Sequence, residues 1–131
     1  MTTLVLDAGA LIALDRYDRD VWAMLRVASD DQSNVYVPTG AIAQAWRDGA
    51  LQALLAKALS PCEELALDGT TARAAGLLCG KTGTSDVIDA AVAIAAAGAS
   101  QHSPTAVLTS DVGDIGNLID SLDSAATVVA V

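Results

Sequence analysis

The chain is poor in several residue types that particular classes of protein require. It has no phenylalanine, one histidine and two cysteines among its 131 residues. Cys62 and Cys79 lack the close spacing of metal ligands, and we expect them to be reduced core thiols of a cytoplasmic protein. A catalytic triad has no support, because the lone His102 lies in a polar loop and neither Ser110 nor Thr109 has a histidine near it in sequence.

Long apolar runs are also missing, although hydrophobic residues make up 53% of the chain and the mean hydropathy is +0.44. The longest uncharged stretch, 90–110, is interrupted by glycine, glutamine, histidine and proline, so we expect no membrane span. The N-terminus has no basic segment and carries Asp7 where a signal peptide would be apolar. The apolar content excludes a disordered chain, and the length suits a single domain over residues 1–131.

Positive charge is scarce. Seven Lys and Arg residues oppose sixteen Asp and Glu residues, which gives a formal net charge of −9. Glu63 and Glu64 are the only glutamates, so nearly all of the acids are aspartates. An acidic protein repels nucleic acid at long range, and a nuclease of this composition would need bound metal ions or a basic partner to offset its charge.

Short β-prone runs alternate with segments of helical pattern. Strands are expected at 3–6, 35–37, 62–67, 105–108 and 126–131, and helices at 8–15, 20–28, 41–46, 50–59, 70–79, 86–97 and 111–122. We expect Ser85 to cap the helix at 86–97, and Gly80 and Gly98 to end two of the helices. The alternation predicts an α/β protein with a central parallel sheet of four to five strands between two layers of helices.

Aspartates gather where the strands of this sheet are expected to end, and ligands bind at that edge of open parallel sheets. Asp7 follows the first strand, and Asp111 and Asp114 follow the fourth. Asp86 and Asp89 open the preceding helix and share one of its faces. Converging carboxylates repel one another, and a hard divalent cation such as Mg²⁺ or Mn²⁺ offsets that repulsion. Taken singly, each aspartate is more often a helix cap than a ligand, so spacing alone leaves both roles open.

Three segments of the chain match a known family pattern. They are Leu4–Leu14 (LVLDAGALIAL), Asp89–Ala93 (DAAVA) and Leu108–Ile115 (LTSDVGDI). Together they resemble the PIN-domain ribonuclease toxins of the VapC type. The resemblance implies a three-layer α/β/α PIN-like fold and a Mg²⁺- or Mn²⁺-dependent endoribonuclease that cleaves RNA with a metal-activated water. It implies that Asp7, Asp89 and Asp111 bind the metal and that Asp86 is a further catalytic acid. Asp114 is expected to act as a helix cap instead.

One position departs from the family pattern. Gln44 stands where the family usually has a glutamate, on the helix after the second strand. Glutamine forms hydrogen bonds but adds no negative charge, so Gln44 could position a water without acting as a carboxylate base. We keep Gln44 among the candidate catalytic residues. The alternative is a non-catalytic PIN-like binding module that lost its activity through this residue.

The resemblance also implies partners. Toxins of this type are typically dimeric and are held inactive by a cognate antitoxin whose C-terminal segment lies over the site. An acidic site predicts that this segment is basic. RNA is the expected substrate, and Arg47 and Arg16 are the candidates for contacting its phosphates. Trp22 and Trp46 are expected to be core residues, with a role as interface anchors as the alternative.

Three other classes of protein are disfavoured by the sequence. A phosphotransferase of the haloacid dehalogenase type needs a second aspartate two residues after the first, and Gly9 stands there. A receiver domain needs a late lysine, and none follows Lys81. A dinucleotide-binding protein needs a glycine-rich phosphate loop, which this segment does not form.

Overall fold

A parallel sheet of five strands in the order β3-β2-β1-β4-β5 forms the centre of the protein. The computed structural model describes residues 1–131. The strands are β1 (Thr3–Leu6), β2 (Val35–Pro38), β3 (Glu63–Leu65), β4 (Thr105–Thr109) and β5 (Thr127–Ala130). Each of the first four strands is followed by at least one helix, which carries the chain back so that the next strand can run parallel.

The two central strands are apolar along their whole length because both of their faces are covered. Every residue of β1 and of β4 is buried, and the two strands pair in parallel register, with Val5 opposite Val107. A continuous apolar run is the pattern of a strand between two helical layers. The edge strand β3 instead exposes Glu63 and Glu64, and charges at a sheet edge discourage pairing with another chain.

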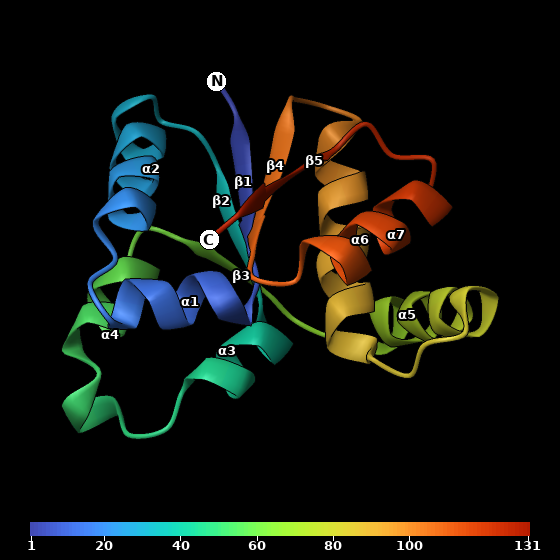
Figure 1. The fold of residues 1–131 in the computed structure, drawn as a ribbon, viewed down its shortest axis with the longest axis horizontal. Helices are drawn as coiled ribbons and strands as arrows, with labels where there is room; N and C mark the ends of the chain where they lie inside the picture. The colour runs from blue at the N-terminus through green and yellow to red at the C-terminus, as the bar shows by residue number, and fades with distance from the viewer.

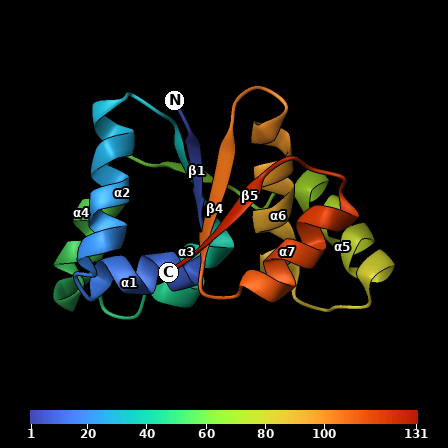
Figure 2. The ribbon, with the colours of Figure 1, turned by 45° about the horizontal axis from the view of Figure 1, so that its top comes forward.

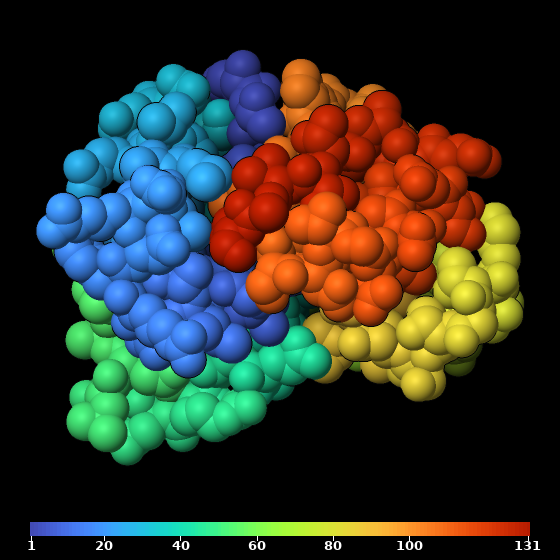
Figure 3. Space-filling view, viewed as in Figure 1, coloured from blue at the N-terminus to red at the C-terminus, as the bar shows by residue number.

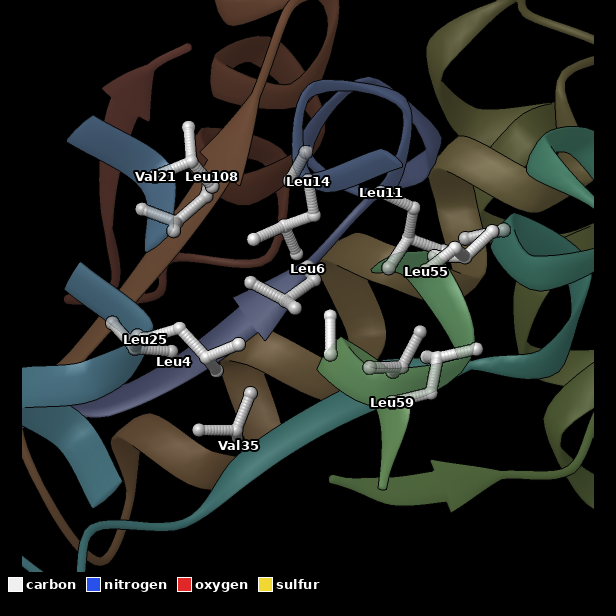
Figure 4. Packing of buried hydrophobic residues seen from close by; sticks show 14 of the residues in the cluster. Leu4, Leu6, Leu11, Leu14, Val21, Leu25, Val35, Leu55, Leu59 and Leu108 are labelled. Atoms are coloured by element: carbon white, nitrogen blue, oxygen red, sulfur yellow. The ribbon is translucent and has the colours of Figure 1, made fainter. Parts of the chain in front are cut away.

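Helices cover both faces of the sheet (Figures 1 and 2). The helices are α1 (Ala8–Asp15), α2 (Arg19–Asp30), α3 (Thr39–Ala45), α4 (Ala53–Leu59), α5 (Gly69–Thr82), α6 (Val87–Ser100) and α7 (Val112–Ser121). The first four pack on one face and the last three on the other. Each face has its own hydrophobic cluster. Figure 4 shows Leu4 and Leu6 of β1 among leucines of the first cluster. This arrangement confirms the predicted three-layer α/β/α fold.

Alanine lets the second helical layer approach the sheet closely. Ala90, Ala93 and Ala96 of α6 are fully buried in the second cluster. Their spacing places all three on one stripe of the helix. No helix is both long and apolar enough to cross a membrane.

The segment after α3 differs from the prediction of one continuous helix at 50–59. Gly49–Leu51 forms a short 3-10 helix, η1, and α4 begins only at Ala53. Between them the buried Gln52 organises the turn. Its Oε1 accepts hydrogen bonds from the main-chain N–H groups of Arg47 (2.7 Å) and Asp48 (2.9 Å). Its Nε2 donates to the carbonyl of Ala45 (2.9 Å). A buried polar side chain satisfied in this way fixes an irregular segment.

Three predictions about the ends of helices were wrong. Gly80 and Gly98 lie inside α5 and α6, and α5 ends instead at Gly83, whose φ of 75° is left-handed. A glycine inside a helix costs only about 1 kcal/mol, which the packing of its neighbours outweighs. Ser85 does not cap α6, because Asp86 is the N-cap and its carboxylate accepts from the main-chain N–H of Asp89 (3.0 Å). The remaining boundaries differ from prediction by no more than two or three residues.

Candidate functional site

The candidate site lies at the C-terminal edge of the two central strands. Three aspartates there are the N-caps of helices: Asp7 of α1, Asp86 of α6 and Asp111 of α7. Strand ends and helix beginnings meet at this edge, so the same topology that caps the helices also gathers their carboxylates. Capping and clustering are therefore compatible roles for these residues.

Three carboxylates form the centre of the cluster. Asp89, Asp111 and Asp114 each offer an oxygen, and these oxygens all lie within 4.8 Å of one another. Asp89 is half-buried, whereas Asp111 and Asp114 are exposed. The structure thus brings Asp114, which was expected to be only a cap, into the group; the capping residue of α7 is Asp111, which accepts from the main-chain N–H of Asp114 (3.4 Å).

Asp7 is not one of these three carboxylates, but its charge acts on Asp89, and its side chain is held in place from two sides. It is only 5% exposed. One carboxylate oxygen accepts from the main-chain N–H of Ala10 (3.2 Å), and the other accepts from the hydroxyl of Thr109. The Thr109 Oγ1 also accepts from the main-chain N–H of Asp111 (2.9 Å). A single buried threonine therefore couples the aspartate that follows β1 to the aspartate that follows β4.

Close approach of two backbones shapes the same corner. A Cβ added to Gly9 would lie 2.7 Å from the Ser110 Cβ and 2.9 Å from its main-chain nitrogen. Only glycine fits at this distance. Gly9 therefore lets the beginning of α1 pack directly against the turn between β4 and α7.

Repulsion among the carboxylates changes their affinity for protons. Partial burial, followed by the charges of Asp86, Asp111 and Asp7, raises the pKa of Asp89 to about 7. Burial also raises the pKa of Asp7, against the opposing effect of the hydrogen bond from Thr109. The charge of Asp111 raises the pKa of Asp114. Every charge that acts on these three groups is another carboxylate, so the cluster lacks an internal counter-ion.

The donor set fits a hard divalent cation. All donors are carboxylate oxygens, which Mg²⁺ and Mn²⁺ prefer. Bonds of about 2.1 Å hold two ligands of one ion at most about 4.2 Å apart, so small rotations of the exposed side chains would close the group onto one ion. A carboxylate oxygen has more than one lone-pair direction, so Asp7 can accept its present hydrogen bonds and still bind a cation.

A recess of about 130 Å³ opens beside the cluster. Asp89 and Asp114 line it together with Thr84, Asn117 and residues of α5 and α7. None of the recess residues other than the two aspartates was singled out by sequence reasoning, although Thr84 lies only five residues before Asp89. Asn117 lies three residues after Asp114, on the same face of α7, and that spacing is the signal that indicates its proximity.

The other predicted site residues, Gln44, Arg47 and Arg16, form no hydrogen bond with the aspartates. Gln44 is exposed near the end of α3 and makes no hydrogen bond with the aspartates. The Arg47 guanidinium donates to the carbonyls of Ala43 (3.1 Å) and Trp46 (2.8 Å), where it caps the end of α3. Arg16 follows the last residue of α1, so the length of that helix, about 12 Å, separates it from Asp7.

Comparison with known proteins gives a structural likeness but no sequence match. No family model matches the chain, and no curated protein matches it. The fold is similar to that in the crystal structure of VapBC2 from Rickettsia felis bound to a DNA fragment from their promoter. The TM-score is 0.67 at 12% sequence identity, and the match covers 99% of each chain. At this identity the likeness establishes the fold alone. It confirms the fold that the VapC resemblance implied.

Proposed function

We propose that this protein is a cytoplasmic, Mg²⁺- or Mn²⁺-dependent endoribonuclease and the toxin of a VapBC-type toxin–antitoxin pair. The observation that supports the proposal is the group formed by Asp89, Asp111 and Asp114, which the charge of Asp7 also reaches and on which no cation acts. The shared fold with a VapBC2 structure and the three sequence motifs point the same way.

Each side chain has a distinct task in this proposal. A bound divalent cation would activate water and neutralise charge on the phosphate. Asp89, Asp111 and Asp114 would bind the cation, together with Asp7, whose orientation Thr109 fixes. Asp86 holds the beginning of α6 through the main-chain N–H of Asp89 and adds negative charge beside it. Because Asp89 has a pKa of about 7, cation binding would displace a proton near neutral pH.

The direct test is cleavage of a panel of structured RNAs, including tRNA, by purified protein with Mg²⁺, Mn²⁺ or EDTA. We expect cleavage that requires the metal and is lost in Asp89→Asn. Asp120→Asn is the matched control, since Asp120 is an exposed acid of α7 outside the cluster. Cleavage that persists in Asp89→Asn, or in EDTA, would contradict the proposed chemistry.

A non-catalytic PIN-like binding module is the second candidate, and Gln44 is the observation that favours it. The amide supplies no carboxylate base, and the Gln44 side chain is exposed and makes no hydrogen bond with the aspartates. Gln44→Glu separates the two candidates. A wild-type protein that is inactive on every RNA but gains metal-dependent cleavage in Gln44→Glu would be such a module. Cleavage by the wild type would show that glutamine is tolerated.

The proposed partners are an antitoxin and a second copy of the chain. The similar Rickettsia felis structure is of a VapBC pair, and a basic C-terminal segment of an antitoxin would offset the uncompensated charge of the aspartate cluster. Pull-down from the native host, followed by charge reversal of the partner's Arg and Lys residues, tests this. Binding that is indifferent to the reversal would contradict the electrostatic account. Light scattering of the purified protein tests the homodimer.

A further inference from the structure

The recess beside the aspartate cluster also carries polar groups that the proposed metal chemistry does not use. We call it the α5–α7 recess, because it lies between the end of α5 and the middle of α7. Its volume is about 130 Å³, and no lysine or arginine lines it. The lining residues are Thr82, Thr84, Asp89, Asp114, Asn117 and Leu118. A ligand in this recess would lie directly beside one bound at the carboxylates of Asp89 and Asp114.

The walls of the recess are held together by the chain itself. Figure 3 shows α7, in orange to red, beside the yellow end of α5 and the loop after it. The Lys81 ammonium in the last turn of α5 donates to the carbonyl of Ser121, the last residue of α7 (2.8 Å). The main-chain N–H groups of Gly83 (2.9 Å) and Thr84 (3.2 Å) both donate to the carbonyl of Cys79. A site that is formed in advance loses little conformational freedom when a ligand binds.

Asn117 offers the recess an amide that has no partner within the chain. It is exposed on α7 and forms no side-chain hydrogen bond with another residue. The hydroxyl of Thr82 already donates to the carbonyl of Leu78 (2.8 Å). The hydroxyl of Thr84 accepts from the main-chain N–H of Asp86 (3.2 Å) and keeps its own hydrogen to donate. Asn117 therefore presents a free donor and a free acceptor side by side, which neither threonine does.

The charge of the recess decides which part of an RNA it can take. The carboxylates of Asp89 and Asp114 repel a phosphate there, since no cation of the chain lines the recess. A phosphate is expected at the metal-binding carboxylates instead, which leaves the recess to a neutral group. Single-stranded RNA offers such a group, because its unstacked bases expose their edges. At about 30 Å³ for each water, the recess holds about four waters, which is space for one flat ring system.

Adenine suits this lining better than the other RNA bases. An asparagine amide pairs with adenine through two hydrogen bonds, in which its carbonyl accepts from N6 and its nitrogen donates to N7. Uracil, cytosine and guanine each carry a carbonyl oxygen, which the neighbouring carboxylates repel, and adenine carries none. We propose that the α5–α7 recess binds an adenine beside the scissile phosphate and that Asn117 recognises it. The inference rests on the proposed ribonuclease function and extends it with a residue that determines specificity.

The first test measures the binding of single nucleotides, which an endonuclease cannot cut. Calorimetry in Mn²⁺ compares AMP with GMP, CMP and UMP. We expect the wild type to bind AMP at least fivefold more tightly than the others, and Asn117→Ala to lose that preference. Asn34→Ala is the matched control, because Asn34 is an exposed asparagine before β2, at the end of the strands away from the aspartates. Alanine favours the helix at position 117, and thermal unfolding confirms that each variant is folded.

The second test reads the base preference from cleavage. Wild type and Asn117→Ala each cut an RNA pool of random sequence in Mg²⁺, and the sequences at the new ends are determined. We expect the wild type to enrich adenine at one fixed position next to the cut, and this enrichment to fall at least fivefold in Asn117→Ala. The affinity for Mn²⁺ without nucleotide should stay the same. A merely structural role of Asn117 would change the rate of cleavage without changing the base preference.

The outcomes separate this inference from the proposed function. Equal affinity for the four nucleotides, binding of none, or preference for another base overturns the assignment of the recess to adenine. Weaker Mn²⁺ binding by Asn117→Ala overturns it by making Asn117 a metal ligand. Binding of an arginine-containing peptide that depends on Asn117, without nucleotide binding, overturns it in favour of a basic protein partner. Metal-dependent cleavage without a base preference keeps the nuclease and rejects the recess. A preference for AMP that depends on Asn117, without cleavage of any RNA, does the reverse.

Discussion

Thr109 is the residue through which the two central strands share one polar site. Its hydroxyl donates to Asp7 and accepts from the main chain of Asp111, and its side chain is fully buried. Thr109→Val keeps the shape but removes both hydrogen bonds. We expect the free energy of unfolding to fall by about 1–3 kcal/mol, because a buried carboxylate loses its partner. Binding of Mn²⁺, measured by calorimetry, should weaken with it.

Thr105→Val provides the matched control for that change. Thr105 is buried on the same strand, and its hydroxyl donates to the carbonyl of Ser103 (3.0 Å) at the end of β4 away from the aspartates. We expect this variant to lose stability in urea unfolding without losing affinity for Mn²⁺. Equal effects of the two variants on Mn²⁺ binding would show that Thr109 has no special role in orienting Asp7.

Asp89 makes stability depend on pH. Its pKa rises from 3.8 to about 7 on folding, mainly through burial and then through the charge of Asp86. Between these values the native state binds more protons than the unfolded state, so the free energy of unfolding falls as pH rises from about 4 to about 7. Asp89→Asn should flatten this decline and, after allowance for solvent screening, be more stable at pH 8 by about 1 kcal/mol. Urea unfolding in EDTA between pH 5 and pH 8 measures the difference.

The control for this prediction is Asp120→Asn, which should keep the slope of the wild type. Parallel pH profiles for the wild type and Asp89→Asn would mean that Asp89 ionises normally in the folded protein. The affinity for a divalent cation should also depend on pH. Because a cation competes with the proton on Asp89, its affinity should decrease as pH falls below about 7.

Single residues of the site could be predicted from the sequence only where the end of a strand or the beginning of a helix could be recognised next to them. Asp7 and Asp111 follow buried apolar runs, and the end of such a run is visible in sequence. Asp114 was expected to be a helix cap, but the N-cap of α7 is Asp111, and the Asp114 carboxylate lies in the acidic group one helical turn later. Thr109 was considered only as a nucleophile without a histidine. Its actual contacts join residues 102 positions apart, and no local pattern encodes them.

At the scale of elements, we expect substitution by alanine to change the stability of the protein in opposite directions at Gly9 and at Gly98. Gly9→Ala would place a methyl group 2.9 Å from the Ser110 main-chain nitrogen, so α1 must shift away from β4. We expect a loss of about 1–3 kcal/mol in the free energy of unfolding. Gly98 lies inside α6 with nothing within 4 Å of the added atom, and Gly98→Ala should stabilise by about 0.5–1 kcal/mol. Urea unfolding of both variants measures the contrast, and a stable Gly9→Ala protein would reject the close approach.

The strands were predictable because burial on both faces leaves an unbroken apolar run, as in β1 and β4. Helix ends were less predictable, because a glycine inside a helix and a glycine that ends one differ only in backbone conformation. Gly83 ends α5 with a left-handed φ, whereas Gly80 stays helical. The break between η1 and α4 depends on the contacts that Gln52 makes across the turn, which no periodicity reveals.

At the scale of the whole molecule, a net charge of −9 disfavours the folded state through general repulsion, and the aspartate cluster adds a local part. Monovalent and divalent ions reduce the general repulsion and the repulsion within the cluster in different ways. Monovalent salt screens all surface charges gradually. A divalent cation that binds the cluster stabilises by a saturable amount, about 2.7 kcal/mol at a hundred times its dissociation constant.

We therefore expect Mg²⁺ and Mn²⁺ to raise the free energy of unfolding far more than KCl of equal ionic strength. The excess should disappear in Asp89→Asn/Asp111→Asn, which removes two donors but leaves α7 capped, because asparagine caps a helix as well as aspartate does. It should persist in Asp120→Asn/Asp123→Asn, which removes the same charge elsewhere. Thermal unfolding over a titration of each salt measures it. If all three proteins respond alike at matched ionic strength, the divalent ions only screen charge, and the cluster is a set of helix caps rather than a metal centre.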